Sequence, residues 1–187
     1  MSKAWPVPSL DPEAPLAVNA RLILRVRVAE LYHYEPIVHD AQAGELLHDM
    51  RISAKRLRYT LELFSDAFGK QGAKQIARVK EIQEILGELH DADVRIEIIE
   101  DELTKLAAKQ MRELSARLKV EPVARHQALL SSALRPPPDD PRRGLIALLG
   151  RQHRVRSEHY ERFVERWDAF AAEGMRVDLV TLSASPK

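Results

Sequence analysis

The chain has 187 residues, of which 45% are apolar and only 5% aromatic, and its formal net charge is +1. This length is enough for one domain with a substantial core, and the balanced charge excludes a globally basic protein, so any site for a polyanion must arise from local sorting of charge. Cysteine is absent, which excludes disulfides and thiolate metal sites.

The N-terminal third of the chain predicts an irregular arm followed by two helices. Residues 1–14 contain three prolines and are expected to form the arm. A helix is predicted over residues 16–34, because Pro15 suits a first helical turn. After a loop, a second helix is predicted over residues 44–68, ended by Gly69.

The middle of the chain predicts a long third helix over residues 73–109. Its interior Gly87 costs about 1 kcal/mol relative to alanine, which indicates close packing or a bend at that position. A fourth helical segment is predicted over residues 111–134, with a break or kink at Pro122.

The C-terminal third begins with the proline-rich stretch 135–141, which is expected to be a rigid, extended connector. A fifth helix is predicted over residues 142–173, ended by Gly174. Residues 175–187 are expected to form a C-terminal tail, either a strand-like cap or a disordered segment. No run of residues has the alternation of a strand. We therefore expect an all-α fold: a bundle of about four to six helices with long antiparallel hairpins, in a single domain over residues 15–174.

The second predicted helix sorts its side chains onto two neighbouring faces. At about 100° per residue, six apolar side chains share one stripe: Leu47, Met50, Ala54, Leu57, Leu61 and Phe64. His48, Arg51, Lys55, Arg58 and Glu62 form a second stripe beside it, and Arg56 lies on another side of the helix. Like charges three or four residues apart destabilise a helix by a few tenths of a kcal/mol per pair. Acidic partners on a neighbouring helix or a bound polyanion would compensate, and a solvated basic face is the remaining alternative.

Two sequence motifs resemble the CHAD family, whose name stands for conserved histidine α-helical domain. The first is LLHDMRISAKRLRYTLELF (residues 46–64), in which His48, Arg51, Lys55, Arg56 and Arg58 match. The second is KEIQEILGELHDADV (residues 80–94), with matches at Leu86, Gly87, His90, Asp91 and Val94. The resemblance implies a non-catalytic helical domain whose basic residues line a surface or pore that binds inorganic polyphosphate.

The family usually has two related repeats, whereas only one is clear here. Residues 144–170 give a faint second match that contains His153 but lacks a Lys-Arg-Leu-Arg cluster. Either the second repeat is degenerate, or two chains supply the pair as a homodimer. We favour the homodimer.

Other basic residues are candidates to extend the binding surface, with solvated surface charge as the alternative. They form pairs three or four residues apart on three predicted helices: Arg21 and Arg25, Lys74 and Arg78, and Arg151 and Arg154. Arg156 falls on the apolar side of the fifth helix, so it should either pair with a carboxylate of the third helix or project into a solvated channel.

The sequence His90-Asp91-Ala92-Asp93 is a poor metal site, because Asp91 points away from the other two side chains and no third ligand is evident. We expect His90 and Asp91 to have a structural role, with Asp91 capping a helix or pairing with an arginine of the second helix. Neither a metal nor a cofactor is predicted.

The leading functional hypothesis is binding of inorganic polyphosphate by the basic stripe. Nucleic-acid backbone binding by the same stripe is one alternative, and a helical adaptor for an acidic protein is another. No nucleophile–base motif or phosphate-binding loop is present, so no enzymatic activity is expected. The sequence begins without an apolar signal segment and contains no run of about 18 apolar residues. A cytoplasmic protein is therefore expected, with association with polyphosphate granules as one option.

Overall fold

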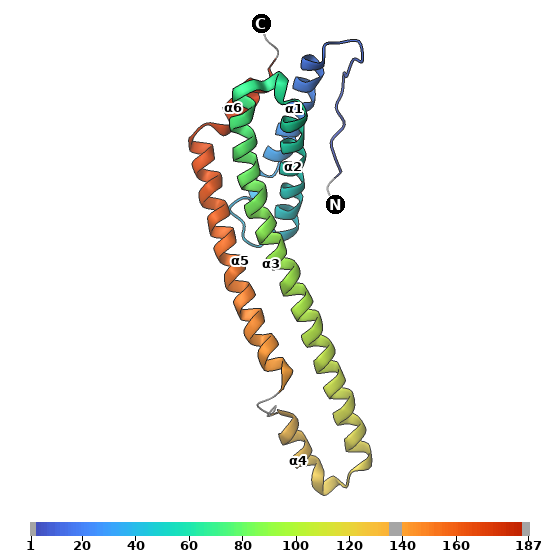
Figure 1. Cartoon of the computed structure of the whole chain (residues 1–187). Helices are drawn as coiled ribbons and strands as arrows, with labels where there is room; N and C mark the ends of the chain where they lie inside the picture. Colours follow the sequence, from blue (N-terminus) through green and yellow to red (C-terminus); the bar gives the residue numbers. More distant parts are fainter. Residues whose placement is uncertain (1–2, 135–139, 185–187) are drawn as a thin grey trace. The chain divides into compact units, whose positions relative to one another are not determined.

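The computed structural model describes residues 3–134 and 140–184, and these residues are almost entirely helical (Figure 1). The elements are α1 (Leu16–Tyr32), a short 3-10 helix (Glu35–Ile37), α2 (Gly44–Leu63), α3 (Ser65–Val120), α4 (Val123–Leu134), α5 (Pro141–Ala172) and α6 (Met175–Ser183). The described ranges contain no strand, and the predicted all-α fold is confirmed. None of the helices in these ranges is both long and apolar enough to cross a membrane.

The chain forms two compact units. The first consists of the residues up to His90 together with those from Ser157 onwards, and the second runs from Asp91 to Arg156. The boundary between the units therefore falls inside α3 and inside α5. The two motifs that resemble the CHAD family lie mainly in the first unit.

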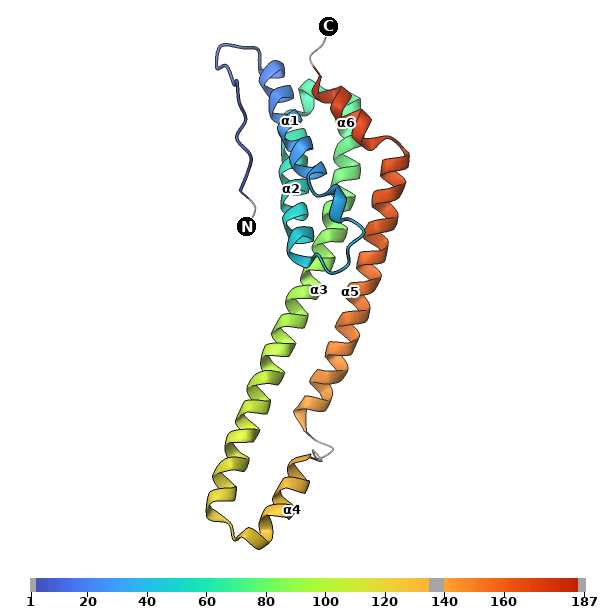
Figure 2. The ribbon, with the colours of Figure 1, turned by 180° about the vertical axis from the view of Figure 1, so that it is seen from behind.

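The first unit packs α1, α2, the first part of α3, the last part of α5 and α6 around one apolar core. Helix α1 contacts both α2 and α6, and the view from behind shows these neighbours (Figure 2). The largest fully buried side chains come from all five helices: Leu24, Leu31, Leu47, Met50, Leu57, Leu61, Ile82, Leu86, Leu89, Phe163, Met175 and Leu179. Five of the six residues in the predicted apolar stripe of α2 are buried, and Phe64 is partly buried against the same core.

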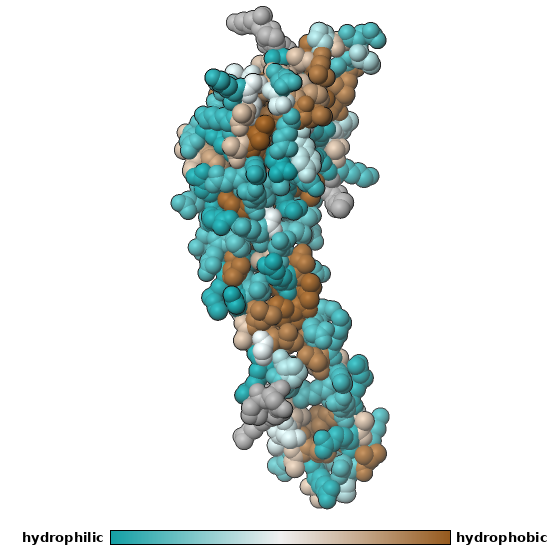
Figure 3. Space-filling model, in the orientation of Figure 1, coloured by the Kyte–Doolittle hydropathy of each residue, from teal (hydrophilic) through white to brown (hydrophobic). Residues whose placement is uncertain are grey.

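The second unit has a much smaller apolar core. Among its described residues, the buried apolar side chains are Ala92, Ile96, Ile99 and Leu129. Large apolar side chains remain exposed instead, including Ile146 and Leu148 on the first half of α5. Apolar surface gathers over this part of α5 (Figure 3).

Several predicted helix boundaries differ from the structure. Helix α2 ends at Leu63 rather than near Phe68, and α3 begins at Ser65. Gly69 does not end α2 but forms a kink inside α3. Its φ of 52° lies in the left-handed region that glycine adopts without steric cost, and the helix resumes after it.

Further along, α3 continues past Lys109 to Val120. The residues around Lys109 are good helix formers that give no reason for a break. The chain turns instead at Pro122, as predicted, and α4 follows.

The C-terminal segment is also different from the prediction. Instead of a strand-like cap or a disordered tail, residues 175–183 form helix α6. Gly174, with a φ of 77°, separates α5 from α6. Met175 and Leu179 lie one turn apart and are both buried, so packing on the core accounts for this short helix. Of the predicted connector 135–141, residues 135–139 lie outside the described ranges, and Pro141 begins α5.

Candidate functional site

Four polar side chains lie along one flank of α2: His48, Arg51, Lys55 and Arg58, here called the α2 row. Their steps of three and four residues keep them on one side of the helix over about 15 Å. Lys55 is exposed, whereas the other three are half-buried. The half-buried members lie beside the buried stripe that contacts the core. Arg51 and Arg58 are thus held at the edge of the core, whereas Lys55 extends into solvent.

Helix α3 lies against this flank of α2, and its motif residues face the α2 row. The rings of His48 and His90 lie 4.1 Å apart between centroids, with a tilt of 38°. One turn further along α2, Arg51 lies over Gly87: a Cβ added to Gly87 would be 3.5 Å from the Nε of Arg51. Gly87 is thus a neighbour of the Arg51 side chain and does not bend α3, whose only non-helical dihedrals are at Gly69.

The α2 row contains buried polar atoms that lack a hydrogen bond to any described residue. These atoms are His48 Nδ1, Arg51 Nε and Arg58 Nε. Within the described ranges, Arg51 and Lys55 form no ion pair. Arg58 Nε is 3.5 Å from Glu62 Oε1, and its guanidinium lies 4.9 Å from the centre of the Tyr59 ring. Buried donors without acceptors cost free energy, and an anion would relieve that cost.

The surroundings of His48 lower its pKa and so favour the neutral imidazole. Burial lowers the pKa of His48, and the neighbouring His90 lowers it further. Arg51 acts in the same direction, and these effects outweigh the opposing influence of Asp49. A neutral imidazole still has one N–H to donate, and a nearby anion would favour the protonated form.

Several other cations of the first unit are paired with carboxylates. Arg78 is buried and binds Glu173 Oε2 at 2.5 Å and Asp178 Oδ2 at 3.1 Å. Lys74 Nζ is 3.6 Å from the same oxygen of Asp178. The two residues predicted to extend the basic surface therefore join α3 to the end of α5 and to α6. The structure does not bring them into the α2 row.

Two further pairs link α3 to α5. Arg166 Nε lies 2.6 Å from Glu81 Oε1, and Arg162 pairs with Glu88. The carboxylates of these two α3 residues are thus engaged by α5.

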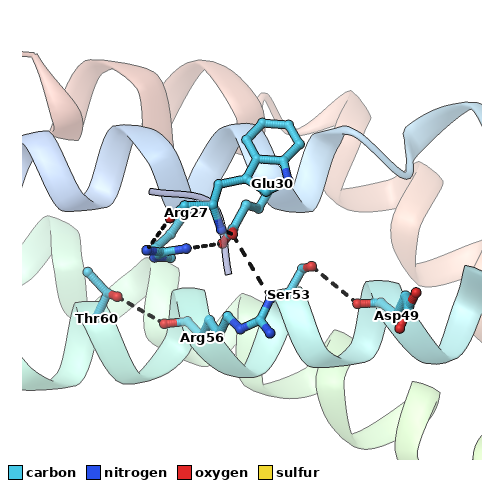
Figure 4. Close-up of polar contacts among 7 residues, drawn as sticks. Arg27, Glu30, Asp49, Ser53, Arg56 and Thr60 are labelled. Atoms are coloured by element: carbon cyan, nitrogen blue, oxygen red, sulfur yellow. Dashed lines mark hydrogen bonds and ion pairs between the residues drawn. The ribbon is translucent and has the colours of Figure 1, made fainter. Parts of the chain in front are cut away.

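Arg56 of α2 lies next to Glu30 of α1 rather than pointing along the α2 row, and Figure 4 shows its contact with Glu30. Its guanidinium is 4.0 Å from the carboxylate of Glu30, which is only 2% exposed. Glu30 also binds Arg27 at 2.5 Å and accepts a hydrogen bond from the backbone N–H of Trp5. Arg56 therefore belongs to a polar cluster that ties α2 to α1 and to the N-terminal arm.

The other predicted basic residues are spread over both units. On α1, Arg21 donates to the carbonyl of Ala17 at 3.0 Å, and Arg25 lies at a groove between α1 and α6. On α5, Arg151 and Arg154 are exposed in the second unit. Their role in ligand binding remains a prediction.

In the His-Asp-Ala-Asp segment, Asp93 rather than Asp91 pairs with an arginine. His90 is the ring partner of His48, and Asp91 is exposed. It is Asp93 that holds an arginine: its Oδ1 is 2.5 Å from Arg156 Nε. Of the two alternatives for Arg156, the structure shows the ion pair with a carboxylate of the third helix. No group of three or more His, Cys, Asp or Glu side chains in the described part of the chain is arranged to hold a metal ion.

Sequence reasoning missed three residues around these contacts. Glu30 and Asp93 are the acidic partners of Arg56 and Arg156, and Gln83 has a buried Oε1 without a hydrogen-bond partner among the described residues. The signal for Gln83 was available in the sequence, because it lies four residues before Gly87 and seven before His90, on the same flank of α3.

Comparison with known proteins gives two similarities. The model of the CHAD domain family matches residues 3–100. An uncharacterized protein of Mycobacterium tuberculosis is 30% identical over 134 residues, which cover 71% of this chain and 23% of that protein. The chain thus spans less than a quarter of the length of this relative. No solved structure matches.

The family match covers more than half of the chain and includes α1, α2 and the part of α3 that faces the α2 row. It therefore includes both motifs on which the resemblance was based and the contacts between them. This chain belongs to the CHAD domain family.

Proposed function

We propose that the chain binds inorganic polyphosphate through the α2 row, without catalysing a reaction. The observation that carries this proposal is the contrast between two sets of cations in one unit. Arg78, Arg162 and Arg166 are held by carboxylates, whereas Arg51 and Lys55 form no ion pair with the described residues. Since like charges along one helix flank repel each other, a bound polyanion supplies the missing compensation.

The chemistry of the row suits a phosphate chain. Guanidinium groups donate two parallel hydrogen bonds to phosphate oxygens, and Lys55 adds a mobile charge. Arg51, Lys55 and Arg58 span about 11 Å of helix, so they can contact successive phosphates of one ligand. Binding of this kind releases counterions, and the affinity should therefore fall steeply as salt is added.

Nucleic acid is the second candidate, since its backbone offers the same phosphates. Proteins that bind single strands without sequence preference usually stack bases on aromatic side chains. Tyr59 is the aromatic residue beside the α2 row; it is 48% exposed and already lies under Arg58. Because the Arg58 guanidinium already covers the Tyr59 ring, the α2 row favours a ligand without bases.

The test is a titration of the full chain with long-chain polyphosphate, single-stranded RNA of equal charge and an acidic peptide, at about 50 to 200 mM salt. Polyphosphate should bind tightest. Equal affinity for the RNA would make nucleic acid the better ligand, and preference for the peptide would favour the adaptor alternative.

A pair of variants with equal charge locates the site. Arg51→Ala with Arg58→Ala should weaken polyphosphate binding at least about tenfold, because two charge-assisted contacts are lost. The control is Arg125→Ala with Arg176→Ala, which removes two exposed arginines that pair with Glu121 and Glu35. If both double variants lose affinity equally while their circular dichroism is unchanged, binding follows net charge and the α2 row is not the site.

A further inference from the structure

The flanks of α2 and α3 that face each other have matching residue spacing. The α2 row occupies positions 48, 51, 55 and 58, and the α3 flank has His90, Gly87, Gln83 and Lys80 at the same intervals in the opposite direction. Two contacts fix the register: His48 with His90, and Arg51 with Gly87. Because both helices rise about 1.5 Å per residue, we expect Gln83 to lie near Lys55 and Lys80 to lie near Arg58.

Gln83 has unused hydrogen-bonding capacity at this position. It is half-buried, and its Oε1 is buried without a hydrogen bond to any residue in the described ranges. Leaving such an oxygen unpaired costs about 1–3 kcal/mol. A carboxamide has two donors and one acceptor oxygen, and a half-turn of the group exchanges them. Gln83 can therefore accept from a cation of the α2 row and donate to an anion at once.

The α3 flank also lacks a carboxylate that would repel an anion at its middle positions. Glu81 and Glu88, on either side of Gln83 in the sequence, are held by Arg166 and Arg162 of α5. Glu84 Oε1 lies 3.8 Å from Lys80 Nζ and compensates the charge of this lysine at the end of the flank. The surface that α3 presents at Gly87 and Gln83 is thus neutral and hydrogen-bonding.

We propose that Gln83 is a phosphate-contacting residue, and that α2 and α3 form a track with two walls. In this track α2 supplies positive charge, Gly87 leaves room for the Arg51 guanidinium, and the Gln83 carboxamide donates to a phosphate oxygen. This inference rests on the proposed function, and it adds a neutral contact that the basic residues do not provide.

A neutral contact and a charged contact differ in their response to salt. Replacing Gln83 by Ala removes a hydrogen bond but no charge, so the affinity should fall about three- to tenfold with an unchanged salt slope. Replacing it by Arg adds a cation inside the track, so binding should tighten and the salt slope should steepen by about one unit. The control is Gln71→Arg, which has the same net charge but lies on exposed α3 surface about 120° around the helix.

The experiment is isothermal titration of the full-length variants with long-chain polyphosphate at about 50, 100 and 200 mM salt. Absence of binding by the unmodified chain would overturn the proposed function. Binding by the unmodified chain, with Gln83→Ala equal to it and Gln83→Arg equal to Gln71→Arg, would overturn only the role of Gln83.

A second measurement does not depend on how the variants fold. In a ¹H–¹⁵N spectrum of the unmodified chain, the side-chain amide signals of Gln83 should shift as polyphosphate is added, while those of Gln71 stay in place. Binding without a shift of the Gln83 amide would likewise overturn the inference.

Discussion

Replacement of Gly87 separates its helical cost from its role beside Arg51. An alanine Cβ at this position would lie 3.5 Å from Arg51 Nε, which is an ordinary van der Waals contact. Gly87→Ala should therefore leave the guanidinium in place and stabilise α3 by about 1 kcal/mol, the difference in helix propensity. For a chain of this size, that free energy corresponds to a rise in Tm of about 2–4 °C.

A larger side chain should have the opposite effect on binding. The atoms of leucine beyond Cβ would enter the space that the Arg51 guanidinium occupies, so Gly87→Leu should displace Arg51 and weaken polyphosphate binding. Thermal unfolding by circular dichroism and titration with polyphosphate measure the two effects. A lower Tm for Gly87→Ala would refute the expected fit of a Cβ beside Arg51. Full affinity for Gly87→Leu would refute the assignment of Gly87 as the residue that makes room for the Arg51 guanidinium.

Three other outcomes are expected. Arg78→Met should destabilise the first unit by about 2 kcal/mol in urea unfolding, because it removes the charged partner of two carboxylates, and should leave polyphosphate affinity unchanged. Because the pKa of His48 is lowered in the folded chain, its contribution to the free energy of unfolding is complete above the unfolded pKa of about 6.5 and is lost as the pH falls. A bound anion favours protonated His48, so polyphosphate affinity should rise from about pH 8 to about pH 6, with a smaller rise in His48→Gln. An equal rise in both proteins would show that His48 does not cause the pH dependence. We expect a homodimer that covers the exposed apolar side chains of the second unit, and a monomeric mass in analytical ultracentrifugation at micromolar concentration would contradict it.

The repeat of apolar residues along α2 was sufficient to predict its buried face. Leu47, Met50, Leu57 and Leu61 are each at most 2% exposed, because a regular helix turns such residues toward one side. Helix ends were harder to predict. The step between α2 and α3 at Phe64 has no proline or glycine to mark it, and the length of α3 depends on good helix formers continuing without a stop signal.

Short helices that depend on tertiary contacts were not predictable in this way. Helix α6 has nine residues, too few to be stable alone, and it forms because Met175 and Leu179 are buried against other helices. The sequence pattern of so short a segment is compatible with several conformations. Only the core that it completes selects the helix.

Charge pairing was the least predictable property, and it is the one on which the functional proposal depends. Lys74 and Arg78 have the same spacing on α3 as Arg51 and Lys55 have on α2, so a helical wheel treats the two pairs alike. Their shared partner Asp178 lies about 100 positions away in the sequence, on α6, and no local pattern reveals this contact.

Arg56 and Arg58 also differ in their partners, although both belong to the Lys-Arg-Leu-Arg motif. Arg56 turns toward the buried carboxylate of Glu30, and Arg58 remains on the flank shared with Arg51. Two residues apart on a helix means about 200° around its axis, so a single motif serves two purposes. Arg56 links α2 to α1 and the N-terminal arm through Glu30. This contact helps to position α2, which carries Arg51 and Arg58 on another flank. Binding strength should therefore depend on Arg56 through the position of α2, and on Arg51 and Arg58 through contact with the ligand.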